Sequence, residues 1–181
     1  MNDIQSDFSK IILSTEIIQN RVTELAYQIN NDYKDVEQLL IVSILRGAFI
    51  FTADLTRQLS IPHIVDFMAI TSYGKSTSTG EVRIIMDLRE AIENQHVLII
   101  EDIIDGGHTL HYLYNLLQDR KPASLQTCVM TGKKRERLNV PINYLGFEIP
   151  DVWAVGYGLD YADQYRTLPY IAELKKEIYT K

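Results

Sequence analysis

Two spacings of apolar residues alternate along this sequence. In residues 14–31, apolar side chains recur about every 3.6 positions after a Ser/Thr capping signal, which predicts an amphipathic helix. Continuous β-prone runs at Leu39–Leu45 and 97–101 predict buried strands, and helical spacing returns in 48–59 and 109–118. Further strands are expected at 63–70, 82–87, 124–130, near Tyr144 and at 153–155.

This order of elements predicts an α/β fold with a mainly parallel central sheet and flanking helices. Strands that are apolar throughout are typical of a parallel sheet covered on both faces. No internal repeat and no Pro/Ser-rich linker divides the chain, and its 181 residues suit one domain. We therefore expect residues 1–181 to form a single domain.

The composition excludes several classes of protein. The apolar share of 46% and the charged share of 23% are typical of a globular chain. No apolar run approaches the roughly 20 residues that span a bilayer, and the polar, acidic first ten residues do not resemble a signal peptide. The one cysteine, Cys128, has no partner for an internal disulfide. We expect a cytoplasmic protein with no membrane contact, and the net charge of −6 argues against a nucleic-acid partner.

The strongest candidate for a functional site follows the second buried strand. Glu101 and Asp102 end that strand, and Asp105 precedes the glycine pair Gly106-Gly107, which opens a predicted helix. Glycines expose backbone N–H groups and a helix N-terminus carries partial positive charge, so a phosphate group fits there. The two adjacent acids suit vicinal sugar hydroxyls or a magnesium ion shared with them. The segment therefore predicts a site for a ribose phosphate.

Each of these residues also has a simpler explanation when it is taken alone. Asp105 is then a helix cap, the glycines only turn the chain, and the two acids are solvated charges at a strand end. The combination favours the functional interpretation, because sugar acceptors, a third carboxylate and a phosphate cradle occur within a few residues. Thr109 adds a hydroxyl donor to that cradle.

This segment resembles the phosphoribosyl-diphosphate signature of the type I phosphoribosyltransferases, in which two acids and an Asp-x-Gly-x-Thr turn follow a hydrophobic strand. Leu45-Arg46-Gly47 resembles the pyrophosphate loop of that family, and Ser72-Tyr73-Gly74 resembles the start of its catalytic lid. Lys133 and residues 152–161 resemble the purine site of the hypoxanthine-guanine phosphoribosyltransferases in their short bacterial form. The resemblance covers nearly the whole chain after the first helix.

Two positions depart from the family pattern. Gly106 stands where the family usually has a hydroxyl residue, which removes one side-chain donor to the 5-phosphate. Arg46 stands where lysine is common, and it keeps the positive charge.

The resemblance implies the type I phosphoribosyltransferase fold, with a small hood formed by the terminal segments and a flexible lid at about 71–80. It also implies a role in purine salvage: transfer of the 5-phosphoribosyl group from 5-phosphoribosyl 1-diphosphate to N9 of hypoxanthine or guanine. The products would be IMP or GMP and pyrophosphate, the cofactor would be Mg²⁺, and the enzyme would be a homodimer or homotetramer.

The same resemblance implies a role for each matching residue. Asp105 would be the catalytic acid or base at purine N7. Glu101 and Asp102 would contact the ribose and, together with Asp160, magnesium. The 5-phosphate would be bound by Asp105, Gly106, Gly107, His108 and Thr109. The pyrophosphate would be bound by Arg46, Gly47 and Arg166.

The implied lid begins with Ser72 and Tyr73, and the implied purine site consists of Lys133, Trp153, Ala154 and Asp160. Lys133 would contact the purine O6 and Trp153 would stack on the ring. Without the resemblance, Trp153 is explained as a core aromatic and Lys133 as part of a solvated charge run at 132–137.

Two other functions compete with this interpretation. The first is a nucleotide-sensing regulator on the same fold, which would require a basic nucleic-acid-binding face or an added domain; the charge and the length favour neither. The second is a phosphoribosyltransferase for adenine or a pyrimidine, against which Lys133 and Trp153 argue. The order of preference among hypoxanthine, guanine and xanthine stays open at this point.

Overall fold

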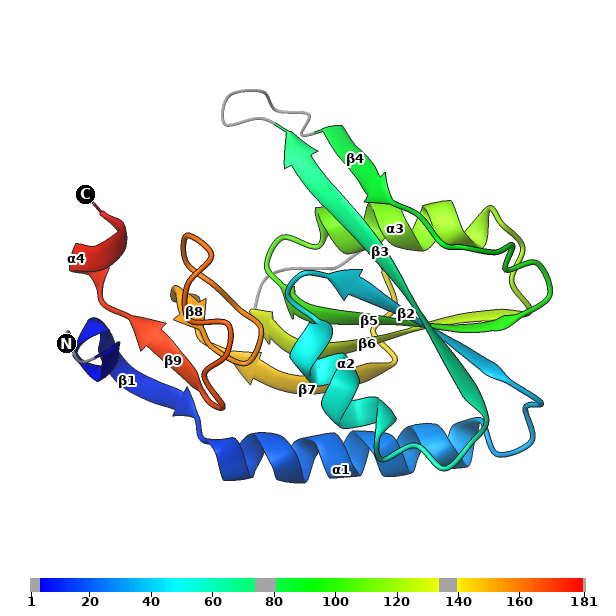
Figure 1. Ribbon diagram of the computed structural model, residues 1–181, viewed down its shortest axis with the longest axis horizontal. Helices are drawn as coiled ribbons and strands as arrows, with labels where there is room; N and C mark the ends of the chain where they lie inside the picture. The colour runs from blue at the N-terminus through cyan, green and yellow to red at the C-terminus, as the bar shows by residue number, and fades with distance from the viewer. Residues whose placement is uncertain (1–3, 74–80, 134–139, 181) are drawn as a thin grey trace.

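A six-stranded sheet forms the centre of the computed structural model, which describes residues 4–73, 81–133 and 140–180 (Figure 1). Its strand order is β4-β3-β2-β5-β6-β7, and every pair is parallel except β3 with β4. The strands are β2 (Leu39–Leu45), β3 (His63–Tyr73), β4 (Glu81–Met86), β5 (His96–Ile104), β6 (Ser124–Lys133) and β7 (Tyr144–Ile149). The predicted α/β fold with a mainly parallel sheet is confirmed.

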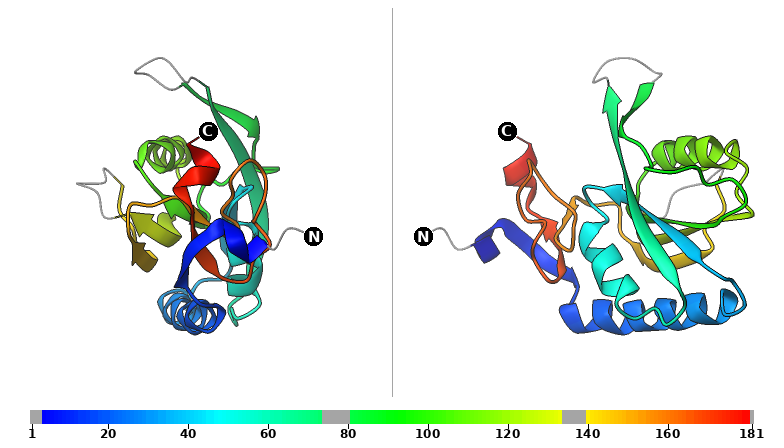
Figure 2. Two further views of the ribbon diagram at one scale, coloured as in Figure 1. Left: turned by 90° about the vertical axis from the view of Figure 1, so that its left-hand side faces the viewer. Right: turned by 45° about the vertical axis from the view of Figure 1, so that its right-hand side comes forward.

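Helices cover both faces of this sheet, with α1 (Thr15–Asp32) and α2 (Phe49–Thr56) on one side and α3 (His108–Gln118) on the other (Figures 1 and 2). Successive side chains of β2 explain the two cores. Leu39 and Ile41 pack in the cluster that contains α1 and α2, whereas Leu40 and Val42 pack in the cluster that contains α3. None of the helices in the described part of the chain is long and apolar enough to cross a membrane.

The first helix begins one residue later than the sequence pattern predicted. Ser14 is its N-cap, and the Ser14 Oγ accepts a hydrogen bond of 3.3 Å from the backbone N–H of Ile17. The helix buries one apolar stripe against the sheet, made of Ile18, Val22, Leu25, Ala26 and Ile29. That stripe is the 3.6-residue spacing seen in the sequence.

A second, smaller sheet joins the two ends of the chain (Figure 2). Its order is β1-β9-β8, with β1 (Phe8–Leu13), β9 (Ile171–Leu174) and β8 (Ala154–Val155), and both pairs are antiparallel. A 3-10 turn (Ile4–Asp7) precedes β1, and the short helix α4 (Lys176–Tyr179) follows β9. The sequence pattern did not predict β1 or β9.

Several elements end at different residues from those expected. β5 continues to Ile104 because Ile103 and Ile104 pair with Thr131 and Gly132 of β6, so Glu101 and Asp102 lie within the strand. β3 continues to Tyr73 because its last residues pair with β4. α2 covers only part of the expected range 48–59.

The strand order also indicates where a ligand site is expected. From β2 the chain crosses to β3 on one side of the sheet, and from β5 it crosses to β6 on the other side. In open α/β sheets, such a reversal leaves a crevice at the carboxyl ends of the two central strands, where ligands bind. Here those ends carry Arg46 and Gly47 after β2, and the acidic segment at the end of β5.

Candidate active site

Three segments meet at the crevice so closely that two of them have glycine at the contact. A Cβ added to Gly47 would lie 1.6 Å from Oδ2 of Asp102, and a Cβ added to Gly158 would lie 2.0 Å from the carbonyl oxygen of Gly47. Gly158 also has φ of +102°. The loop after β8 therefore packs directly against the backbone of the loop after β2. The loop after β2 in turn packs against the Asp102 side chain at the end of β5, and neither contact leaves room for a Cβ.

Gly158→Ala is expected to lower the free energy of unfolding by about 2 to 4 kcal/mol, because the new Cβ meets a carbonyl oxygen at a left-handed backbone position. Urea unfolding measures the change. Gly132→Ala is the matched control, since its Cβ would meet only the tip of Leu145 at 3.4 Å. A Gly158→Ala protein as stable as the native one would contradict the close packing.

The turn from β5 to α3 forms the first of two adjoining cavities. It has a volume of about 290 Å³ and is lined by residues 101–110, which include all five residues predicted to bind the 5-phosphate. Gly107 is the N-cap of α3 with φ of +73°, and as a glycine it supplies no side-chain acceptor to the first turn of the helix. A phosphate group at this turn could accept hydrogen bonds from backbone N–H groups at the helix N-terminus.

Glu101 and Asp102 form a buried acidic pair beside this cavity. Burial raises the pKa of both carboxyl groups, and the charge of Asp102 raises the pKa of Glu101 further. The Oε2 atom of Glu101 is buried without a hydrogen-bond partner among the described residues. An orphaned carboxylate oxygen beside a second carboxylate fits a hard divalent cation, since Mg²⁺ prefers oxygen ligands.

The third predicted metal ligand, Asp160, is engaged elsewhere. Its Oδ1 lies 2.7 Å from Nη2 of Arg166, and its Oδ2 accepts a hydrogen bond of 2.9 Å from the backbone N–H of Asp163. Across the ranges that the structure describes, no three His, Cys, Asp or Glu residues are grouped to hold a metal ion by themselves. The acids thus offer a partial set of ligands, as is usual where Mg²⁺ is completed by water and substrate phosphates.

The two arginines predicted to bind pyrophosphate converge on one carboxylate. Nη2 of Arg46 lies 2.6 Å from Oδ1 of Asp163, and Nη2 of Arg166 lies 3.3 Å from the same atom. Nη1 of Arg166 also donates to the carbonyl oxygen of Gly158 at 2.8 Å, which ties this arginine to the crevice. The structure therefore brings Arg46, Gly47 and Arg166 together around a position where an anionic oxygen already lies.

The second cavity, of about 220 Å³, contains every residue predicted to bind the base. It shares Asp102, Ile103 and Asp105 with the first cavity. The rest of its wall consists of Lys133, Val152, Trp153, Ala154, Leu159 and Asp160. The cavity at the β5–α3 turn is thus joined, through the end of β5, to a slot whose wall combines one lysine and three aspartates with apolar side chains.

Aromatic side chains surround Trp153 on the wall of the second cavity. The Tyr179 ring stacks on Trp153 with centroids 5.1 Å apart, and the Tyr161 ring meets it edge to face at 5.3 Å. Trp153 remains 44% exposed, so it is not the core residue that its sequence context alone would suggest.

Sequence reasoning missed several residues of the site. Asp151 and Asp163 were not singled out, because each forms an ion pair with a residue distant in the sequence: Asp151 with Lys133, and Asp163 with Arg46. Ile103 was placed in the segment after the predicted strand 97–101 and given no role, although its position between two acids of the signature was a signal. Tyr179 contacts Trp153 from a helix that the sequence pattern did not predict.

Part of the predicted lid lies outside the described residues. Ser72 and Tyr73 end β3, but residues 74–80 are not described, and nor are the charged residues Lys134, Arg135 and Arg137.

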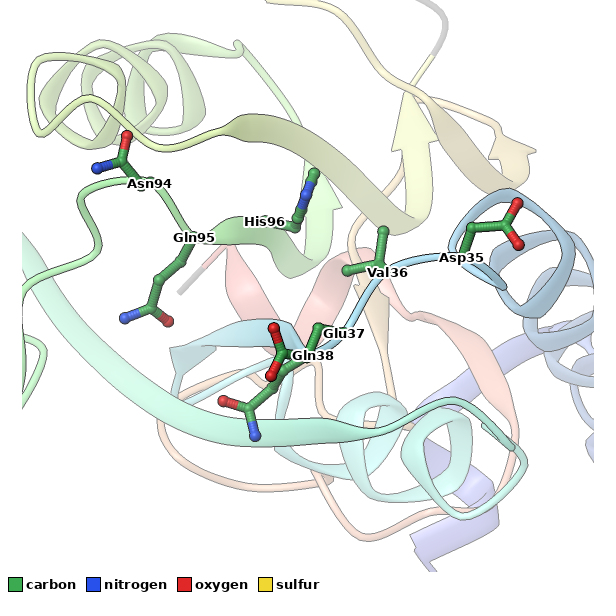
Figure 3. A pocket seen from close by; sticks show the side chains of 7 residues that line it. All are labelled: Asp35, Val36, Glu37, Gln38, Asn94, Gln95 and His96. Carbon is green, nitrogen blue, oxygen red and sulfur yellow. The ribbon is translucent and has the colours of Figure 1, made fainter.

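A larger cavity, of about 540 Å³, lies at the opposite end of the sheet, where β2 and β5 begin (Figure 3). Its polar side chains include Asp35, Asn94 and His96, and Figure 3 shows them pointing in different directions rather than toward a common centre. Size alone does not make it the candidate site, because ligands of open α/β sheets bind at the carboxyl ends of the strands.

Comparisons with known proteins identify the family of this chain. The family model described as phosphoribosyl transferase domain matches residues 9–162. Hypoxanthine-guanine phosphoribosyltransferase of Dictyostelium discoideum is 49% identical over 177 residues, which cover 95% of this chain and 98% of that protein.

Solved structures of related proteins also match this chain in fold and sequence. A hypoxanthine phosphoribosyltransferase from Staphylococcus aureus matches with a TM-score of 0.93 and 43% identity over the full length of both chains. The hypoxanthine phosphoribosyltransferase of Trypanosoma cruzi, solved in complex with the product IMP, matches with a TM-score of 0.88 and 43% identity, covering 96% of this chain and 97% of that one.

Proposed function

Because this chain belongs to the phosphoribosyltransferase family, we propose that it transfers the 5-phosphoribosyl group from 5-phosphoribosyl 1-diphosphate to N9 of hypoxanthine or guanine. The products are IMP or GMP and pyrophosphate, and the reaction belongs to purine salvage. The observation that carries this proposal is the union of two cavities at the end of β5, one a phosphate cradle and the other a slot with Lys133 and Trp153.

The reaction breaks the bond from the anomeric carbon to the diphosphate and forms the bond to N9, with positive charge developing on the ribose. The enzyme must therefore stabilise the departing anion and exclude water. Arg46, the Gly47 backbone and Arg166 would bind the pyrophosphate, which is supported by the contact of both arginines with one carboxylate oxygen. The turn at 105–109 holds the 5-phosphate, so that the anomeric carbon lies between the two anchors.

Magnesium is part of the proposal. When bound, it neutralises negative charge on the diphosphate. Glu101 and Asp102 would hold the ion with the ribose hydroxyls, and the orphaned Glu101 oxygen supports this assignment. Asp160 would be a further contact of the ion, and Arg166, its ion-pair partner in this structure, would bind the diphosphate.

The base occupies the second cavity in this proposal. Lys133 donates a hydrogen bond to the purine O6, Trp153 stacks on the ring, and Ala154 and Asp160 border the opposite end of the slot. Asp105 exchanges a proton at N7, because it is shared by both cavities and its side chain is half exposed.

The assembly and the compartment are further parts of the proposal. We expect a homodimer or homotetramer, since Ile64, Phe67, Ile85 and Met86 expose apolar surface on the strands β3 and β4. We expect a cytoplasmic enzyme, because its substrates are phosphorylated metabolites of the cell interior.

One assay tests the proposed function. The protein is incubated with 5-phosphoribosyl 1-diphosphate and magnesium, and hypoxanthine, guanine, xanthine and adenine are supplied in turn while pyrophosphate release and ultraviolet absorbance are followed. Turnover with the 6-oxopurines supports the proposal. Efficient turnover of adenine, or no turnover with any 6-oxopurine, overturns it.

Lys133→Met is expected to lower kcat/KM for hypoxanthine. The loss should correspond to about 1.5 to 3 kcal/mol of transition-state stabilisation, the usual scale for losing a hydrogen bond to a charged group. An ammonium group has only donors, so it matches the O6 acceptor and opposes the 6-amino group of adenine. The residual rate with adenine should therefore fall far less than the rate with hypoxanthine. Equal losses for the two bases would show that Lys133 does not read O6.

A further inference from the structure

Lys133 is held between two carboxylates from different segments. Its Nζ lies 3.2 Å from Oδ2 of Asp105 and 3.2 Å from Oδ1 of Asp151. The lysine side chain is only 11% exposed, whereas both acids are about half exposed. The buried partner of this triad is therefore the cation, and the acids fix where its ammonium group lies.

The two acids differ in their positions. Asp105 belongs to the turn that opens α3 and borders both cavities, so it contacts the reacting base in the proposed function. Asp151 follows β7 and precedes Trp153 by two residues, and it is not among the residues that line either cavity. Lys133 itself is the last residue of β6. Asp151 thus holds the ammonium from outside the slot.

The Lys133 ammonium group has more N–H donors than the two carboxylates occupy. A lysine ammonium has three N–H donors. With one directed at Asp105 and one at Asp151, the third has no partner among the described residues and can donate to an acceptor in the slot. During the reaction Asp105 must turn to N7, and its bond to Lys133 is then weakened. Of the two ion pairs, the one with Asp151 can hold the ammonium in place throughout turnover.

We propose that Asp151 is a positioning residue that holds Lys133 toward the 6-oxo group of the base and keeps it from pairing with Asp105 alone. The inference rests on the proposed function, in which Lys133 donates a hydrogen bond to O6 and Asp105 exchanges a proton with N7. Asp151 touches neither the base nor the sugar. It sets the selectivity for 6-oxopurines by acting through Lys133.

The role predicts a specific kinetic signature for Asp151→Asn. KM for hypoxanthine should rise about 3- to 10-fold, the scale of one partly exposed ion pair, while kcat and KM for 5-phosphoribosyl 1-diphosphate change less than about 2-fold. Asp151→Glu should recover most of the loss because it restores the carboxylate. Glu148→Gln, which neutralises an exposed acid on β7, is the matched control and should change none of these constants.

A double-mutant cycle separates positioning from a general structural role. In the Lys133→Met background, Asp151→Asn should leave KM for hypoxanthine unchanged, because the side chain that it positions is gone. If Asp151→Asn raises KM by the same factor in both backgrounds, Asp151 acts through the loop and the proposal is wrong. It is equally wrong if the native enzyme uses hypoxanthine well and Asp151→Asn has no effect. A native protein that uses no 6-oxopurine would instead refute the proposed function itself.

Discussion

Replacing Asp105 with asparagine is expected to lower kcat by about 10²- to 10⁴-fold, the range for a lost general acid or base. Asparagine keeps the size of the side chain and one oxygen acceptor, but it cannot exchange a proton with N7. A chemical role agrees with the position of Asp105, which lines both cavities and lies 3.2 Å from Nζ of Lys133. Binding of 5-phosphoribosyl 1-diphosphate, measured by calorimetry, should stay within several-fold of the native value.

Two controls make this result interpretable. Asp119→Asn changes an exposed acid at the far end of α3 and should leave kcat unchanged. KM for hypoxanthine should also be measured, because the Asp105→Asn protein loses one of the two carboxylates that hold Lys133. If diphosphate affinity collapses while kcat at saturation survives, Asp105 is a ligand of the sugar rather than the acid or base.

Replacing Gly107 with valine is expected to weaken ribose 5-phosphate binding by 100-fold or more. The residue has φ of +73°, a left-handed conformation that costs a non-glycine residue about 1 to 2 kcal/mol and is least accessible to a β-branched one. If the turn changes conformation, its N–H groups no longer point into the cradle. Each charge-assisted hydrogen bond lost there costs about 1.5 to 3 kcal/mol. Calorimetry with ribose 5-phosphate and with GMP measures the loss.

Asparagine at the same position is the matched control. Its side chain is close to valine in size but tolerates the left-handed region, so Gly107→Asn should bind more tightly than Gly107→Val. Circular dichroism should show that both variants keep their helices. Retained affinity in Gly107→Val would place the 5-phosphate elsewhere.

Most of the central fold could be predicted because its signals are local. A strand that is buried on both faces is apolar at every position, as β2 is, and α1 repeats its buried residues at helical spacing. The small sheet gives no such signal. Only the last residue of β1 is buried, and its partner β9 lies at the other end of the chain, so the pairing of Phe8 with Leu174 cannot be inferred from either segment alone.

The candidate site divides in the same way. The acids, glycines and Thr109 of the β5–α3 turn are close together in the sequence. Their grouping at one cavity could therefore be predicted from the sequence alone. The contacts of Asp151 and Asp163 join segments separated by many residues, and only the folded chain shows them. The burial of Glu101, which orphans one of its oxygens, likewise depends on how far β5 continues beside β6.

The aromatic contacts of Trp153 have a practical consequence for following this protein in solution. Trp153 is the only tryptophan among the 181 residues, so all of the indole emission of the chain arises at the wall of the base slot. Its ring is stacked on Tyr179 of the C-terminal helix and touched by Tyr161. The fluorophore thus reports on a single place, where the end of the chain meets the position proposed for the base.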